Sequence, residues 1–228
     1  MSPFNIQTST SFVILAAGGS SRMGRPKQLL EYKDATLIHH AIEIALRAKK
    51  LSDSSPDIFI VLGSKSDDIR YEISSTFNRK ERKESTILIN PEWQEGIASS
   101  IRCGVTALLR QMEHGAKGDK DSRHAHETDA ALFLLCDQPL VTSEHLAAIL
   151  DFYVKTDALI VASEYSNIIG VPALFRKALF PELLKLTGDE GARSVIRAHQ
   201  KEALGIPFPA AEFTIDQPAD YEKLISMR

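Results

Sequence analysis

The chain has 228 residues, of which 43% are hydrophobic and 25% charged, and its formal net charge is -3 at pH 7. This composition predicts a single globular domain, residues 1–228, and argues against a nucleic-acid binder, which usually carries a basic face. The sequence has no stretch typical of a membrane span or signal peptide, and its two cysteines lack metal-type or redox-type spacing. We therefore expect a cytoplasmic protein with neither a nucleic-acid nor a membrane partner.

Short runs of β-branched and other apolar residues recur along the chain and predict buried strands. They lie at residues 12–15, 58–62, 86–89, 130–135, 158–162 and 213–215. Stretches with helical spacing, such as 37–46 and 97–109, lie between them. This alternation predicts an α/β fold of three layers, doubly wound around a mainly parallel sheet. Residues 113–128 are polar and without apolar periodicity, which predicts a mobile surface loop.

A glycine-rich loop follows the first predicted strand. Residues 15–30 read LAAGGSSRMGRPKQLL, with glycines at positions 18, 19 and 24. Glycine tolerates positive φ and lets backbone amides approach an anion, so the loop predicts a phosphate site. The glycine spacing does not match the fingerprint G-x-G-x-x-G, which disfavours a dinucleotide site.

The same loop also differs from a P-loop. The second and third glycines have the P-loop spacing, but Arg25 and Pro26 follow where Lys and Ser or Thr are required. Because Pro26 disfavours a helix directly after the last glycine, we expect an extended turn to carry Lys27 past the loop. The backbone amides of the loop would then be surrounded by Arg22, Arg25 and Lys27. This arrangement suits a triphosphate, which can be contacted from several sides.

The loop resembles the signature L-A-x-G-x-S-x-R-M-G-x-x-K of the MobA-like nucleotidyltransferases. Five further segments resemble the subgroup of this family that contains the molybdenum cofactor cytidylyltransferases: NPEWQEGIASSIRCG (90–104), LLCDQPLV (134–141), GVPALF (170–175), GDEGAR (188–193) and IDQPADY (215–221). The resemblance implies the Rossmann-like nucleotide-diphospho-sugar transferase fold, a divalent magnesium cofactor and transfer of a nucleotidyl group.

Two aspartates are candidates for holding that magnesium. Asp137 comes just after the predicted strand 130–135, and ligands of open α/β sheets sit beyond the carboxyl ends of strands. Mg²⁺ typically takes one or two protein carboxylates together with phosphates and water. The resemblance implies this role for Asp137, and less firmly for Asp216, which follows the predicted strand 213–215. An aspartate at a strand end can equally cap the next helix or turn.

The resemblance also assigns roles to individual residues. Arg22, Lys27 and Asp137 are the predicted catalytic residues. The predicted nucleotide contacts are Leu15, Ala16, Ala17, Gly18, Gly19, Ser20, Gly24, Ser99 and Ser100. The predicted acceptor contacts are Gly170, Pro172, Asp189 and Arg193. Two alternatives stay open: the serines can cap a helix, and residues 188–193 can be a structural turn in which Asp189 caps the following helix.

The function expected from these features is transfer of CMP from Mg-CTP to the terminal phosphate of molybdopterin, with release of pyrophosphate. CTP is favoured over GTP because family members that use CTP tend to carry LAAG, as residues 15–18 do here. The partners would be CTP, the pterin acceptor and a recipient molybdoenzyme or its chaperone. The alternatives are a cytidylyltransferase for a sugar or polyol phosphate such as methylerythritol phosphate, a GTP-using relative, and a non-catalytic carrier of the pterin cofactor.

Overall fold

A computed structural model of the chain describes residues 9–52, 56–116 and 128–227. The described strands form a seven-stranded sheet in the order β5-β4-β1-β6-β8-β7-β9 and a small two-stranded sheet, β2-β3. The bounds of the strands are β1 Thr10–Ala16, β2 Glu31–Tyr32, β3 Ala35–Thr36, β4 Asp57–Leu62, β5 Ser85–Ile89, β6 Ala130–Leu135, β7 Ile160–Tyr165, β8 Ile168–Arg176 and β9 Ala203–Pro207.

The large sheet is mainly parallel, as the sequence predicts. β1 runs parallel to β4 and β6, β4 runs parallel to β5, and β7 runs parallel to β9. β8 is antiparallel to both of its neighbours, β6 and β7. The carboxyl ends of β1, β4 and β6 therefore meet at one edge of the sheet.

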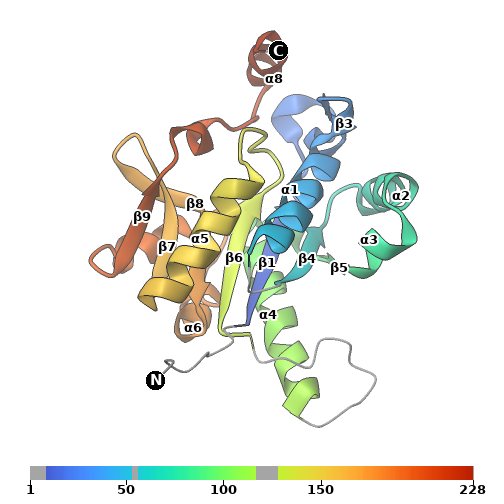
Figure 1. The fold of residues 1–228 in the computed structure, drawn as a ribbon. Helices are drawn as coiled ribbons and strands as arrows, with labels where there is room; N and C mark the ends of the chain where they lie inside the picture. Colours follow the sequence, from blue (N-terminus) through green and yellow to red (C-terminus); the bar gives the residue numbers. More distant parts are fainter. Residues whose placement is uncertain (1–8, 53–55, 117–127, 228) are drawn as a thin grey trace.

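Helices cover both faces of this sheet and complete the three predicted layers (Figure 1). Along β1, Phe12 and Ile14 face one apolar cluster while Val13 and Leu15 face the other, since successive strand residues point to opposite faces. α1, α2 and α5 bury their apolar residues in the first cluster, and α4, α6 and α7 in the second. The helices are α1 Leu37–Leu51, α2 Ser66–Thr76, α3 Arg79–Lys83, α4 Ile97–Ala116, α5 Ser143–Thr156, α6 Phe180–Leu183, α7 Arg193–Ala198 and α8 Pro218–Ser226.

The expected strand at 213–215 is wrong. These residues form no ladder; Ile215 instead donates one backbone hydrogen bond to Asp137 O at 3.0 Å, because the chain crosses the end of β6 there. β8 and β9 were not predicted, since Gly170 and Pro172 in β8 and Gly205 in β9 are residues that normally weaken a strand pattern.

The predicted bounds of the polar loop are also wrong. α4 continues to Ala116, so residues 113–116 are helical although they carry no apolar periodicity. Thr128, at the other end, is buried, with its hydroxyl 3.4 Å from that of Ser11. Residues 117–127 of the predicted loop lie outside the described residues. Within the described part of the chain, no helix has the length and apolar character needed to cross a membrane.

Candidate active site

A cavity of about 600 Å³ opens where β1 and β6 end. The carboxyl edge of parallel strands is where open α/β folds bind ligands. The wall of the cavity contains most of the predicted site residues: Leu15, Ala16, Ala17, Gly18, Gly19, Ser20, Arg22, Lys27, Ser100, Asp137, Asp189 and Asp216. The predicted residues outside this wall are Gly24, Ser99, Gly170, Pro172 and Arg193.

The signature loop, residues 15–30, makes two sharp turns beside this cavity. Ser20 has a φ of 53°, a 3-10 turn follows at Ser21–Met23, and Gly24 closes it with a φ of 68°. Pro26 has a φ of -59° and a ψ of 114°, which is outside the helical region, and Lys27 then begins a second 3-10 turn, Lys27–Leu29. The backbone path is therefore not that of a P-loop, in which a helix starts at the last glycine. Gly24 is a turn residue, which explains its place outside the cavity wall.

Gly18 and Gly19 differ in what a side chain at each position would meet. A Cβ atom on Gly18 would have no heavy atom within 4 Å, so this exposed position leaves the cavity open. A Cβ atom on Gly19 would come within 2.7 Å of Trp93 Cζ3. Glycine at position 19 therefore lets the indole ring of Trp93 pack on the signature loop, where the ring also lines the cavity.

Lys27 and Asp137 form the charged centre of the cavity. Lys27 Nζ donates to Asp137 Oδ2, and the two side chains are only 16% and 13% exposed. Burial lowers the pKa of Lys27, but the charge and hydrogen bond of Asp137 outweigh it, so the pKa lies above its ordinary value. Lys27 is therefore a cation at neutral pH.

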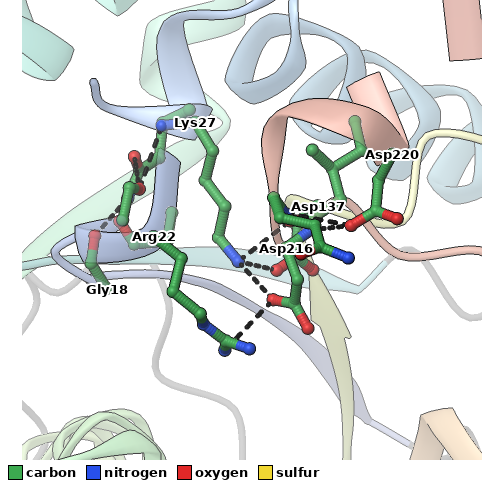
Figure 2. Close-up of polar contacts among 11 residues, drawn as sticks. Gly18, Arg22, Lys27, Asp137, Asp216 and Asp220 are labelled. Atoms are coloured by element: carbon green, nitrogen blue, oxygen red, sulfur yellow. Dashed lines mark hydrogen bonds and ion pairs between the residues drawn. The ribbon is translucent and has the colours of Figure 1, made fainter. Parts of the chain in front are cut away.

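Asp216 and Arg22 form an outer layer around this pair (Figure 2). Asp216 Oδ1 lies 3.5 Å from Lys27 Nζ and 3.7 Å from Arg22 Nη2. The side chains of Asp216 and Arg22 are 45% and 73% exposed. Because exposed ion pairs are weak, these two side chains can rearrange around a ligand more freely than Lys27 and Asp137 can.

The C-terminal segment brings Asp216 to the site. Ile215 is buried in an apolar cluster with residues of the signature loop and the start of α1, and its carbonyl accepts from Lys27 Nζ at 3.3 Å. Asp220, in the first turn of α8, accepts from Asp216 N at 3.0 Å. Arg25, expected near the phosphates, lies 5.4 Å over the ring of Tyr221 in α8 and outside the cavity wall.

The carboxylates fit a divalent cation. Asp137 Oδ1 is buried without a hydrogen-bond partner among the described residues, although such an atom normally has one. With Asp216 it offers the oxygen ligands that Mg²⁺ prefers. Among the described residues no group of three or more His, Cys, Asp or Glu side chains could hold a metal. Mg²⁺ commonly completes its coordination with water and the phosphates of a substrate.

The two predicted serines at the start of α4 face different ways. Asn90 Nδ2 donates to Ser99 Oγ at 2.8 Å and to Ser100 Oγ at 3.1 Å, and Ser99 Oγ donates to Gly96 O at 2.8 Å. Ser100 lines the cavity, whereas Ser99 lines a separate groove beside β5. Ser99 therefore braces the first turn of α4, and Ser100 is the serine that can meet a ligand.

An ion pair joins residues 186–191 to the start of α4. Arg102 Nη1 donates to Glu95 Oε1 and to Leu186 O, each at 2.7 Å, and Gly188 N donates to Glu95 Oε1 at 3.1 Å. Hydrogen bonding from Arg102 and Gly188 lowers the pKa of Glu95 to about 2. The contact therefore keeps its charge throughout the neutral range.

Asp189 lines the cavity together with the signature loop. A Cβ atom on Gly96 would come within 2.6 Å of Asp189 Oδ1. The open alternative that Asp189 caps a helix is wrong, because the N-cap of α7 is Ala192 and makes no side-chain cap. Asp189 thus lies apart from the other three predicted acceptor residues.

Two of those three residues, Gly170 and Arg193, lie beside Tyr165, in β7. The Arg193 guanidinium lies 5.8 Å over the Tyr165 ring, and a Cβ atom on Gly170 would lie 3.4 Å from Arg193 Nε and collide with the Tyr165 hydroxyl. Pro172 is buried, and its carbonyl accepts from Ser163 Oγ at 2.9 Å. Of the three, Arg193 is half-buried, while Gly170 and Pro172 are buried.

Comparison with known proteins gives the family. A model of the MobA-like NTP transferase domain matches residues 12–203. The chain belongs to this family. It is a nucleotidyltransferase, as the sequence predicts. The match includes Lys27, Asp137 and the start of α4, whereas Asp216 lies beyond it.

Curated relatives are similar at low identity. The nicotine blue oxidoreductase of Paenarthrobacter nicotinovorans is 27% identical over 81% of this chain and 80% of the relative. The molybdenum cofactor cytidylyltransferase of Escherichia coli is 29% identical over 45% of this chain and 46% of the relative. The molybdenum cofactor guanylyltransferase of Vibrio campbellii is 24% identical over 85% and 82% of the two chains.

Solved structures share the fold. Rv0371c of Mycobacterium tuberculosis H37Rv superposes with a TM-score of 0.73 at 24% identity, covering 96% of this chain and 99% of that one. A complex of Rv0371c with manganese gives a TM-score of 0.67 at 23% identity, covering 96% and 98%. The expected Rossmann-like transferase fold is confirmed by this likeness.

Several residues of the cavity wall were not predicted. They include Gln28, Trp93, Gln94, Ile97 and Thr214. Trp93 and Gln94 lie inside the segment 90–104 that carried the resemblance, so their position was a usable signal. Gln28 stands between Lys27 and an apolar Leu-Leu pair, and its burial could not be read from hydropathy.

Proposed function

We propose that the protein transfers CMP from Mg-CTP to the terminal phosphate of molybdopterin carrying molybdenum, with release of pyrophosphate. The observation that carries the proposal is the contact of Lys27 with Asp137 at the end of the signature loop, with Asp216 beside it. A cation and two carboxylates at the carboxyl edge of the sheet suit a triphosphate with its divalent metal.

The residues of the signature loop would hold the triphosphate. Gly18 leaves room for it, Lys27 supplies a buried positive charge, and Arg22 supplies an exposed one that can follow the phosphates. Preorganised charges of this kind stabilise the charge that develops during phosphoryl-type transfer. Lys27 would turn from Asp137 toward the phosphates when they are present.

Asp137 and Asp216 would hold the magnesium ion. The buried and unpartnered Asp137 Oδ1 supports this role most strongly. When bound, the ion would offset the negative charge of the triphosphate and polarise the α-phosphate. Asp216 is more exposed and would contribute less.

An acceptor phosphate is already ionised at neutral pH, so no side chain has to remove a proton from it. The work left to the protein is alignment of two anions. Arg193, beside Tyr165 and Gly170, is our candidate for holding the acceptor, and Gly170 and Pro172 would shape the β8 segment next to it. Asp189 would act at the border of the two substrates.

CTP is the proposed nucleotide because residues 15–18 read LAAG. The relatives named above include both a cytidylyltransferase and a guanylyltransferase, so a GTP-using activity is the nearest alternative. The segment 188–193 argues against a sugar or polyol phosphate acceptor such as methylerythritol phosphate. The product would pass to a molybdoenzyme or its chaperone in the cytoplasm.

One relative is named an oxidoreductase, and this favours testing a second activity. The glycine spacing of the signature loop disfavours a dinucleotide, so we expect no reduction by NADPH. The remaining alternative, a non-catalytic carrier of the pterin cofactor, predicts acceptor binding without turnover.

A screen of pyrophosphate release tests these options together. Each of the four NTPs with Mg²⁺ is combined with molybdenum cofactor, methylerythritol phosphate or no acceptor, and NADPH oxidation is followed in parallel. The proposal predicts release with CTP and molybdenum cofactor above every other combination. Release only with GTP, only with the polyol phosphate, or with no pair at all would contradict it.

A further inference from the structure

Two buried glutamines each follow one member of the Lys27 and Asp137 pair. Gln28 is 1% exposed and Gln138 is 3% exposed. Lys27 and Asp137 both line the cavity; Gln28 borders it as well, whereas Gln138 lies outside the cavity wall. A buried amide needs hydrogen-bond partners, and the NH₂ groups of both side chains find theirs in backbone carbonyls. Gln138 Oε1 has no partner among the described residues.

Gln28 links the two ends of the phosphate-facing part of the signature loop. Its Nε2 donates to Ala16 O and to Gly18 O, each at 2.9 Å. Carbonyl oxygens only accept, which fixes the NH₂ end of the amide toward them. Ser20 Oγ donates to Gln28 Oε1 at 3.4 Å and accepts from Lys27 N at 3.0 Å. One side chain thus sets the loop path from the end of β1 to Lys27.

Gln138 makes a comparable link beside the end of β6, outside the cavity wall. Its Nε2 donates to Val171 O at 3.1 Å and to Ala211 O at 2.7 Å. Val171 lies in β8 between Gly170 and Pro172, and Ala211 lies in the 3-10 turn that precedes the segment carrying Asp216. Gln138 therefore ties β8 and the C-terminal segment to the end of β6.

We propose that Gln28 and Gln138 are positioning residues, one for each substrate. Gln28 holds the signature loop in the shape that accepts the triphosphate, and Gln138 holds the β8 segment around Gly170 and Pro172 for the acceptor. The inference rests on the proposed function, because it takes the β8 side as the acceptor side. A purely structural role would instead make both substitutions lower stability and affect both substrates alike.

Matched substitutions separate the two roles. Gln28→Met and Gln138→Met keep the length of the side chain and remove both donors. We expect Gln28→Met to weaken Mg-CTP binding about tenfold by calorimetry, while the KM for molybdenum cofactor stays within about twofold. Gln138→Met should show the reverse. Gln28→Asn and Gln138→Asn keep a shorter amide that reaches at most one carbonyl. Each should change the same constant as its Met counterpart, Mg-CTP affinity or the KM for molybdenum cofactor, but by a smaller factor.

The outcomes decide between the possibilities. If both substitutions change both constants to the same extent, or neither changes any, the positioning roles are wrong. Thermal unfolding shows whether the Met variants fold; if they do not, the Asn pair provides the same comparison.

A wild-type protein that binds Mg-CTP but releases no pyrophosphate with molybdenum cofactor overturns the proposed function instead. Hydrogen exchange then tests the two glutamines without any acceptor. Gln28→Met must speed exchange of amides in residues 16–20 and leave Gly170, Val171 and Ala211 unchanged, and Gln138→Met must do the reverse. Faster exchange spread over both segments in either variant overturns the inference.

Discussion

The proposed nucleotide and acceptor sides of the site are built differently. On the proposed nucleotide side, β1, β4 and β6 are parallel strands, and the ends of β1 and β6 place the signature loop and Asp137 next to one another. On the proposed acceptor side, β8 lies outside the cavity wall and runs antiparallel, and Gln138 and Ser163 donate hydrogen bonds to its carbonyls. The two proposed metal ligands differ in a similar way, because Asp137 follows a central strand while Asp216 lies on an irregular segment.

This contrast indicates that the strand ends and the irregular segment have different roles. A strand end fixes a charged group with little freedom, which suits the part of the reaction that every nucleotidyl transfer shares. The sequence of an irregular segment held by side-chain hydrogen bonds can change with little effect on the packing of the core. Such a segment suits recognition of a particular acceptor. We therefore expect substitutions on the nucleotide side to have the larger effects on turnover.

The largest effect is expected for Asp137→Ala. Loss of the better-placed carboxylate should lower kcat about a thousandfold, since a metal ion contributes several kcal/mol to stabilising charge in the transition state. Pyrophosphate release measures the loss, and circular dichroism checks the fold. Asp157→Asn, an exposed carboxylate at the C-cap of α5, is the control and should keep full activity. Normal turnover by Asp137→Ala would remove the metal role.

Lys27→Met should have the next largest effect. A hydrogen bond from a charged group is worth about 1.5–3 kcal/mol, so Mg-CTP binding should weaken roughly a hundredfold while acceptor binding changes little. Calorimetry with CTP measures this, and Lys80→Met, on α3, controls for the lost positive charge. A larger loss of acceptor affinity than of CTP affinity would mean that Lys27 serves the other substrate.

Acid should weaken the acceptor side through His145. His145 is 5% exposed, stacks on Phe208 and lies 2.7 Å from Ser163 Oγ through Nε2, and burial lowers its pKa from 6.5 to about 4. Between these two values the unfolded chain binds a proton that the folded protein does not. The free energy of unfolding should therefore fall as the pH drops from 6.5 toward 4, by at most about 1.4 kcal/mol per pH unit.

Denaturant unfolding at several pH values checks the role of His145. The variant His145→Gln keeps a donor for Ser163 but has no proton to gain, so its stability should change less steeply between pH 6.5 and 4. Identical slopes for the wild type and His145→Gln would show that another group causes the acid sensitivity.

Asp216→Asn should have the smallest effect of the four. Its side chain is 45% exposed, and exposed charges contribute about 1 kcal/mol, so we expect roughly a fivefold rise in the Mg²⁺ concentration needed for half-maximal activity. A loss as large as that of Asp137→Ala would show that Asp137 and Asp216 hold the metal equally. The contrast between the strand end and the irregular segment would then fail.

The sequence indicated the nucleotide side better than the acceptor side, for physical reasons. Apolar runs and glycine spacing are local signals, and they predict β1, β6 and the signature loop. Phe213 and Ile215 look like strand residues in the same way, but they pack against the signature loop instead of a neighbouring strand. No local pattern reports the contact of Lys27 with Asp137 or the paired carbonyls of Gln28, because these depend on which distant segments meet.

The central claim is that the α-phosphate of CTP moves to the acceptor. CTP labelled at the α-phosphate, incubated with the protein, Mg²⁺ and molybdenum cofactor, should give a labelled pterin dinucleotide, while CTP labelled at the γ-phosphate should give labelled pyrophosphate only. Label from the γ-phosphate in the pterin product, or α-label recovered only as free CMP, would contradict the account.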